Sequence, residues 1–243
     1  MTSAMRRNAT ETVQLEHRRL LAMLDTQVET VEQRFPGRGL VEVAKQVRGA
    51  AARAPALCDH ILRPNLLIRS SVLFLGVAIV AGLIVKMSDL NFGSADGWAV
   101  LEGLEAAINT AVYMGIAIFF LVSVETRRRR DRALTALQEL RALAHVLDMH
   151  QLNKDPERLI FVRESANDEE KSSLAPFLLE RYLDYTADLL AMVGKLAAWY
   201  AQRITDPEVL LAVNELEQLT GGLSLKIWQK IQIVNQVYDR ESE

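Results

Sequence analysis

The sequence predicts an all-α membrane protein with two transmembrane helices, the second extended into a cytoplasmic stem, and a cytoplasmic helical bundle. Two segments are apolar enough and long enough to cross a bilayer. Of the 243 residues 50% are hydrophobic but only 6% are aromatic, and Pro and Gly are sparse, which favours long helices over sheets. Most other segments repeat apolar residues every three and four positions, the spacing of helices with one buried face.

Residues 1–64 are expected to form two N-terminal cytoplasmic helices. The segment begins with polar and charged residues, so no cleavable signal peptide is expected. Apolar residues in 10–34 follow a helical stripe that stops at Pro36. A second helix is expected over about 40–54, because Pro55 lacks the N–H that a helix interior needs.

A transmembrane hairpin is expected over residues 65–125, with spans at about 66–87 and 106–124 and an outward loop at 88–105. The loop contains acidic residues but no Lys or Arg, whereas arginines precede the first span and follow the second. By the positive-inside rule both termini are then cytoplasmic. The run after the second span is also expected to anchor the chain to anionic lipid headgroups: Arg127, Arg128, Arg129 and Arg130.

Residues 126–243 are expected to form a C-terminal cytoplasmic helical domain. No helix breaker follows the second span until Pro156, and apolar residues continue at coiled-coil spacing. The span and its extension are therefore expected to be one helix of about 45 residues, roughly 65 Å long. Beyond a loop at 165–173, two helices are expected to form an antiparallel hairpin that packs on this stem, the second interrupted at Gly221-Gly222.

The stretch DMHQLNKDP and the later run LTGGLSLKIWQKI resemble a family of uncharacterised bacterial two-span helical membrane proteins. The resemblance covers the chain from the second span onward. It implies a bacterial inner-membrane location and no established activity, and it assigns a role to no residue.

His145, Asp148 and His150 are candidate ligands of a divalent metal near the end of the stem. His145 and Asp148 are three residues apart and share a face of a helix. His150 points about 140° away from His145, so one straight helix cannot direct all three side chains at one ion. A site would need a helix break or a second chain, and the alternative is that these residues only flank a packed seam.

Two matching segments, KDPERL and TDPEVL, are expected to be helix starts. In each, an Asp caps the helix, Pro occupies the first turn and Glu lies at the positive end of the helix dipole. Asp155 is therefore expected to be a cap and not a metal ligand, and Asp206 its counterpart.

One face of the second span carries polar residues above apolar ones, and in a symmetric ring it could line a cation pathway. The alternative is an ordinary span with an amphipathic lead-in. The candidate pore-lining residues are Glu102, Glu105, Asn109, Val112, Ile116 and Ser123. Small residues at spacing four, Ala107, Ala111 and Gly115 with Ala78 and Gly82, would allow close helix packing.

Three functions are compatible with these patterns. The first is a homo-oligomeric channel or pore, since two spans alone cannot enclose an aqueous path. The second is a membrane-anchored scaffold or signalling adaptor without transport, whose protein partner the sequence leaves open. The third is metal binding at the stem end. Catalysis lacks a candidate nucleophile or phosphate loop, the net charge of −3 does not favour nucleic acid, and Cys58 is expected to be a buried small hydrophobe.

Overall fold

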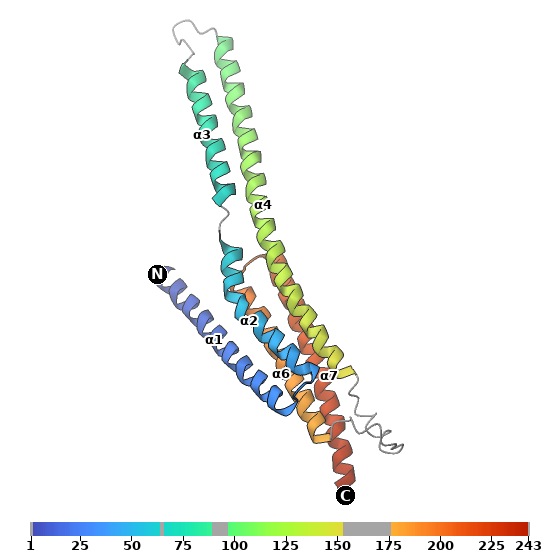
Figure 1. Cartoon of the computed structure of the whole chain (residues 1–243). Helices are drawn as coiled ribbons and strands as arrows, with labels where there is room; N and C mark the ends of the chain where they lie inside the picture. The colour runs from blue at the N-terminus through green and yellow to red at the C-terminus, as the bar shows by residue number, and fades with distance from the viewer. Residues whose placement is uncertain (1, 64–65, 89–96, 153–175, 243) are drawn as a thin grey trace. The chain divides into compact units, whose positions relative to one another are not determined.

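The computed structural model describes residues 2–63, 66–88, 97–152 and 176–242 of the chain. Every secondary-structure element within these ranges is an α-helix, so the predicted all-α class is confirmed for the described residues. The helices are α1 (Thr2–Arg34), α2 (Gly39–Leu62), α3 (Leu66–Ser88), α4 (Gly97–Leu152), α6 (Pro176–Arg203) and α7 (Pro207–Ser242) (Figure 1).

The chain folds into two compact units. Residues 1–60 and 133–243 form the first, which we call the bundle, and residues 61–132 form the second, the apolar unit. Helix α4 contributes its first part to the apolar unit and its last part to the bundle. The N-terminal and C-terminal segments of the sequence thus share one unit, while the proposed three-part division remains a prediction.

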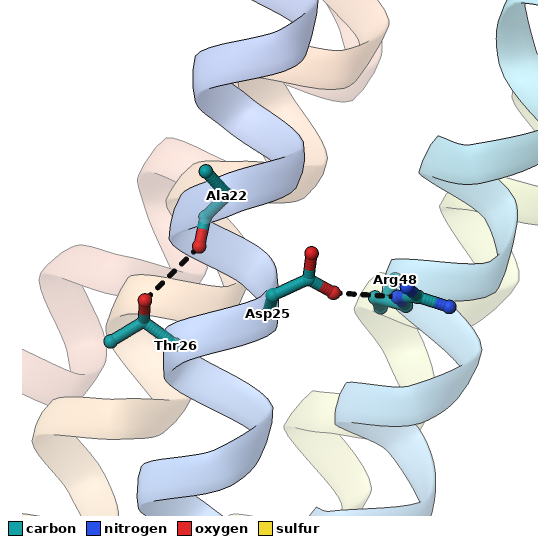
Figure 2. Close-up of polar contacts among 4 residues, drawn as sticks. All are labelled: Ala22, Asp25, Thr26 and Arg48. Atoms are coloured by element: carbon teal, nitrogen blue, oxygen red, sulfur yellow. Dashed lines mark hydrogen bonds and ion pairs between the residues drawn. The ribbon is translucent and has the colours of Figure 1, made fainter.

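Helices α1 and α2 are joined by a tight turn and by ion pairs. The turn contains Gly37 at φ 73°, a left-handed conformation that suits glycine because it has no Cβ. Nε of Arg48 on α2 donates to Oδ1 of Asp25 on α1 at 2.8 Å. Figure 2 shows this pair beside the hydroxyl of Thr26, which donates to the carbonyl of Ala22 at 3.1 Å. The contacts fix the register of the two helices.

Similar polar contacts connect the other neighbours in the bundle. They join α1 to α2 (Lys45–Glu32, 2.7 Å), α2 to α4 (Arg53–Glu139, 2.6 Å), α4 to α7 (Arg141–Glu215, 2.8 Å), α2 to α6 (Asp59–Arg203, 2.9 Å) and α1 to α6 (Gln27–Asp188, 3.3 Å). Helices α6 and α7 also pack directly on each other, as the spacing of their apolar residues predicts. Helices α2, α4, α7 and α6 are therefore joined in a ring, and α1 lies against α2 and α6.

The core of the bundle is built from apolar side chains repeated every three and four residues. Burial of these side chains stabilises the bundle more than its ion pairs do, because exposed ion pairs contribute only about 0–1 kcal/mol each. Fully buried members include Leu24 of α1, Leu40 of α2, Leu140 and Leu147 of α4, Leu189 and Leu196 of α6, and Leu216 and Ile227 of α7. The seam predicted in the continuation of the second span is therefore an intramolecular contact of α4.

Two predicted helix ends are wrong. Helix α2 does not end before Pro55 but continues to Leu62, with the proline inside it. Helix α7 is not interrupted at Gly221-Gly222 and runs unbroken from Pro207 to Ser242. Both segments are held by packing along one buried face, which outweighs the local preference of Pro or Gly. The loop expected at 165–173 lies outside the described residues.

Helix α4 is longer than predicted, with 56 residues from Gly97 to Leu152, and it continues without a break through the arginine run. Among the described residues, one helical segment, Gly103–Gln151, is long and apolar enough to cross a membrane. A shorter apolar stretch, Ser70–Gly82, lies in α3, where the side chains of residues 68, 69, 83 and 86–88 are outside the described set. The fold thus contains one helix compatible with membrane insertion.

The start of α7 follows the predicted capping pattern. Oδ1 of Asp206 accepts hydrogen bonds from the backbone N–H groups of Glu208 at 3.0 Å and Val209 at 3.4 Å. Pro207 is the first helical residue, where its missing N–H costs nothing. The cap at Asp206 is therefore confirmed, while its counterpart Asp155 lies outside the described residues.

We expect Asp206→Ala to destabilise the bundle by about 1 kcal/mol, because two N–H groups of α7 lose their acceptor. Urea unfolding of the full-length protein in detergent, followed by the fluorescence of its tryptophans, measures the change. Asp206→Ser is the matched control and should retain most of the stability. Equal loss in both variants would contradict a capping role.

Candidate functional site

The candidate pore-lining residues form a continuous stripe on α4. At 100° per residue, Glu105, Asn109, Val112, Ile116 and Ser123 fall within about 60° of one another around the helix. All five are exposed in the isolated chain. Glu102 also lies in α4, but its side chain is outside the described residues. The stripe is therefore a single surface that the described part of the chain leaves exposed.

A different face of α4 is the one that its own chain covers. Half-buried positions recur at Ala106, Thr110, Ala117 and Val124, roughly 105° around the helix from the stripe. Half-buried residues of α3 also share one face: Val72, Leu75, Gly76 and Ile79. The polar stripe points elsewhere.

The polar members of the stripe differ in their hydrogen bonding. The hydroxyl of Ser123 donates to the carbonyl of Phe119 at 2.7 Å, a bond within the helix that lets serine enter an apolar environment. Glu105 and Asn109 have no such partner among the described residues. Within the described part of the chain, no other side chain satisfies them.

The arginine run is partly engaged in an ion pair. Arg129 donates to Glu125 one helical turn earlier, and both side chains are largely shielded. Arg127 and Arg128 are exposed, and Arg130 is half-buried and makes a contact of its own. Lipid anchoring by the run remains a prediction, with the two exposed arginines best placed for it.

The three candidate metal ligands at the end of α4 have different surroundings. His145 is exposed, whereas Oδ1 of Asp148 accepts a hydrogen bond from Nε2 of Gln151 at 2.8 Å. The ring of His150 packs against Gly39, the first residue of α2. The contact is so close that a Cβ at this position would clash with Cε1 of His150. The three side chains therefore have separate partners or none.

Within the described part of the chain, no three His, Cys, Asp or Glu side chains are grouped closely enough to hold a metal ion. The end of α4 is instead a packing point. Gln151 is buried, and Nζ of Lys230 on α7 donates to its carbonyl at 3.4 Å, which places a cation at the negative end of the helix dipole. Metal binding by His145 and Asp148 with a second chain stays a prediction.

The sequence reasoning missed a buried histidine that explains why α2 continues through Pro55. Proline has no N–H, so the carbonyl of Ala51, four residues earlier, loses its bond within the helix. Nε2 of His17 on α1 donates to this carbonyl at 2.9 Å, and the imidazole is buried. The ring also packs on Trp199 of α6, with centroids 4.8 Å apart. His17 thus joins three helices, and its position on the apolar stripe of α1 was the available signal.

Ionisable groups near this junction have shifted pKa values. Burial raises the pKa of the Cys58 thiol to about 12, partly opposed by the nearby Arg203 guanidinium. Burial also raises the pKa of Tyr200, and the neighbouring Cys58 and Glu139 add to the shift. Farther along α6, burial and then the Asp184 carboxylate raise the pKa of Asp188, against the lowering effect of its bond from Gln27. Cys58 is thus a protonated, buried thiol at neutral pH.

None of the protein-family models, curated proteins and solved structures compared with the chain matches it.

We expect substitutions of His17 and Pro55 to have coupled effects on the free energy of unfolding. His17→Ala should destabilise the bundle by about 1–3 kcal/mol, because the buried carbonyl of Ala51 loses its donor. In a Pro55→Ala background the restored backbone N–H satisfies that carbonyl, so the same change should cost less. A double-mutant cycle by urea unfolding gives the coupling. Equal costs of His17→Ala in the two backgrounds would show that the bond contributes nothing.

We expect the thiol of Cys58 to resist alkylation at pH 8, because a pKa near 12 leaves almost no thiolate. The folded state favours the protonated thiol, so the associated stability is complete below the unfolded-state pKa of about 9 and is lost as the pH rises towards 12. Mass spectrometry after iodoacetamide treatment, with and without urea, measures the protection. Rapid alkylation of the folded protein would contradict this burial.

Proposed function

We propose that the protein is a homo-oligomeric, two-span protein of the bacterial inner membrane, in which the polar stripe of α4 lines a cation pathway. The observation that carries the proposal is the uncovered stripe on an apolar helix. Glu105 and Asn109 project from a segment whose other exposed side chains, such as Tyr113 and Phe119, are apolar. Leaving a buried amide without a hydrogen bond costs roughly 2–7 kcal/mol. The stripe therefore needs water or other copies of the chain.

The apolar unit supports insertion by two helices. Helix α3 has 23 residues, about 34 Å at 1.5 Å per residue, which suffices for the hydrocarbon core. Its exposed large side chains include Leu67, Leu73, Phe74 and Val77, which would contact lipid. The charge distribution then puts both termini in the cytoplasm.

Oligomer formation is supported by the small residues of both helices. Ala111 and Gly115 of α4 and Ala78 and Gly82 of α3 are exposed, so they are not used for the contact between the two helices. Small residues let membrane helices approach closely, which suits contacts between copies.

The order of residues along the stripe suits cations. Repeated around a symmetric axis, Glu105 forms an acidic ring that concentrates cations at the mouth. Val112 and Ile116 follow about two and three turns further along and form an apolar constriction that can close by dewetting. Ser123 lies beyond it. The proposed pathway thus has an attractive entrance and a narrow barrier.

We expect Glu105→Lys to reduce cation flux into proteoliposomes about tenfold or more, because a ring of cations repels the permeant ion. Flux of K⁺ measured with a fluorescent indicator tests this, and Glu105→Asp, which keeps the charge, should retain flux. If the native protein shows flux that Glu105→Lys leaves unchanged, the stripe does not line the pathway. If the native protein shows none, the pore is excluded and the adaptor function becomes the better proposal.

A further inference from the structure

The line of the α4 stripe does not end at Ser123 but continues into the arginine run. A helix turns about 100° per residue, so about 18 residues complete five full turns and bring a side chain back to the same direction. Helix α4 is unbroken over this distance, so the stripe can be extended along it. The pairs that share a direction in this way are Glu105 and Ser123, Asn109 and Arg127, and Val112 and Arg130. Two of the four arginines therefore lie on the same side of the helix as the stripe.

The other two arginines of the run point away from the stripe. Arg128 and Arg129 lie about 140° and about 240° around the helix from Glu105. Arg129 also donates to Glu125 one turn earlier. Because four consecutive residues cover the whole circumference of a helix, the run presents an arginine on every side of α4. A pathway lined by the stripe must therefore pass arginine at one of its ends.

The charges on this line lie near the two edges of the hydrocarbon core. Arg127 follows Glu105 by about 22 residues, which is about 33 Å at 1.5 Å per residue. The hydrocarbon core of a bilayer is about 30 Å thick. In the proposed topology, Glu105 lies at its outer edge and Arg127 just beyond its inner edge. One side of α4 thus carries opposite charges at opposite ends of the span.

Near the arginines, no acidic residue of α4 lies on this line. Glu125 is about 200° around the helix from Glu105 and is paired with an arginine there. Asp131 is about 80° from Glu105 and has a contact of its own. Arg127 is exposed, whereas Arg130 is half-buried and also makes a contact. The inner end of the line is therefore basic, and Arg127 is exposed on it.

We propose that Arg127, with Arg130 about one turn further along, forms a basic ring at the inner mouth of the pathway, so that cations pass more readily from the outer end than from the inner end. The inference rests on the proposed pore and adds a direction to it. In a symmetric ring, Glu105 raises the local concentration of cations at the outer mouth and Arg127 lowers it at the inner mouth. Under equal voltages of opposite sign, more cations are then available to enter from outside.

The basic ring is a partial barrier and not a block. Arg127 lies about 4–5 Å beyond the expected end of the span at residue 124, where water surrounds its guanidinium group. The high dielectric constant of water weakens its field, and at 0.1 M salt the Debye length is about 10 Å. We therefore expect an asymmetry of about two- to threefold at this salt concentration. The asymmetry should fall towards one at 1 M salt, where the Debye length is about 3 Å.

K⁺ currents through the full-length protein in planar bilayers test the ring. With 0.1 M KCl on both sides, equal voltages of opposite sign should give currents in a ratio of about two to three. Arg127→Glu should bring this ratio close to one, because both mouths then attract cations, and Arg127→Lys, which keeps the charge, should retain the ratio. Arg132→Glu is the matched control, because Arg132 is exposed but lies about 180° around the helix from Glu105.

A charged thiol reagent gives the direction of the asymmetry. In a Cys58→Ala background, Arg127→Cys should lower the ratio, and a cationic methanethiosulfonate should restore it when added to one chamber only. That chamber marks the inner end of the pathway. The larger K⁺ current should flow from the opposite chamber.

Three results would overturn the basic ring. They are a current ratio of one for the native protein, equal changes in Arg127→Glu and Arg132→Glu, and a larger K⁺ current from the inner end. Equal changes would mean that the run acts on every side alike, as a surface charge of the membrane does. The test also separates the two proposals. A symmetric current leaves the pore and removes only the ring, whereas the absence of any current removes the pore and the ring with it.

Discussion

The hydrogen bond from His17 to the carbonyl of Ala51 is the polar contact on which the junction of α1, α2 and α6 depends. Pro55 removes one backbone bond from the interior of α2, and without a replacement donor a helix would end or kink there. Because α1 supplies the donor, α2 continues and Cys58 and Asp59 reach α6 in the correct register. The packing of Trp199 on the imidazole ties α6 to the same point. One side chain thus determines how three helices meet.

Beyond this junction, two surfaces remain that the chain does not cover, and each has a different chemistry. The stripe of α4 places Glu105 and Asn109 on a helix whose other exposed side chains are largely apolar, so in the proposed membrane setting these two side chains would need water beside them. The exposed side of α7 instead carries leucine, tryptophan and amide side chains, such as Leu225, Trp228 and Gln232. In the proposed pore, water and further copies of the chain would meet the requirement of the stripe.

Much of the fold follows from local patterns in the sequence. The spacing of apolar residues predicts the helices, and the TDPE segment predicts the cap at Asp206, because both are interactions between residues close in the chain. The continuation through Pro55 could not be predicted, since its donor lies 34 residues away. Likewise, the stripe of α4 could be predicted from helical periodicity. The contact between His150 and Gly39 could not, because it depends on how helices distant in sequence pack.

The interhelical ion pairs have a consequence for which arrangement of helices is chosen. The buried residues are mostly Leu, Val and Ala, and such apolar faces fit one another in several orders with similar free energies. Opposite charges meet in the observed order, as Arg53 meets Glu139 and Arg141 meets Glu215. A different order of helices would separate these pairs. Contacts that add little stability can therefore still discriminate against misassembled topologies.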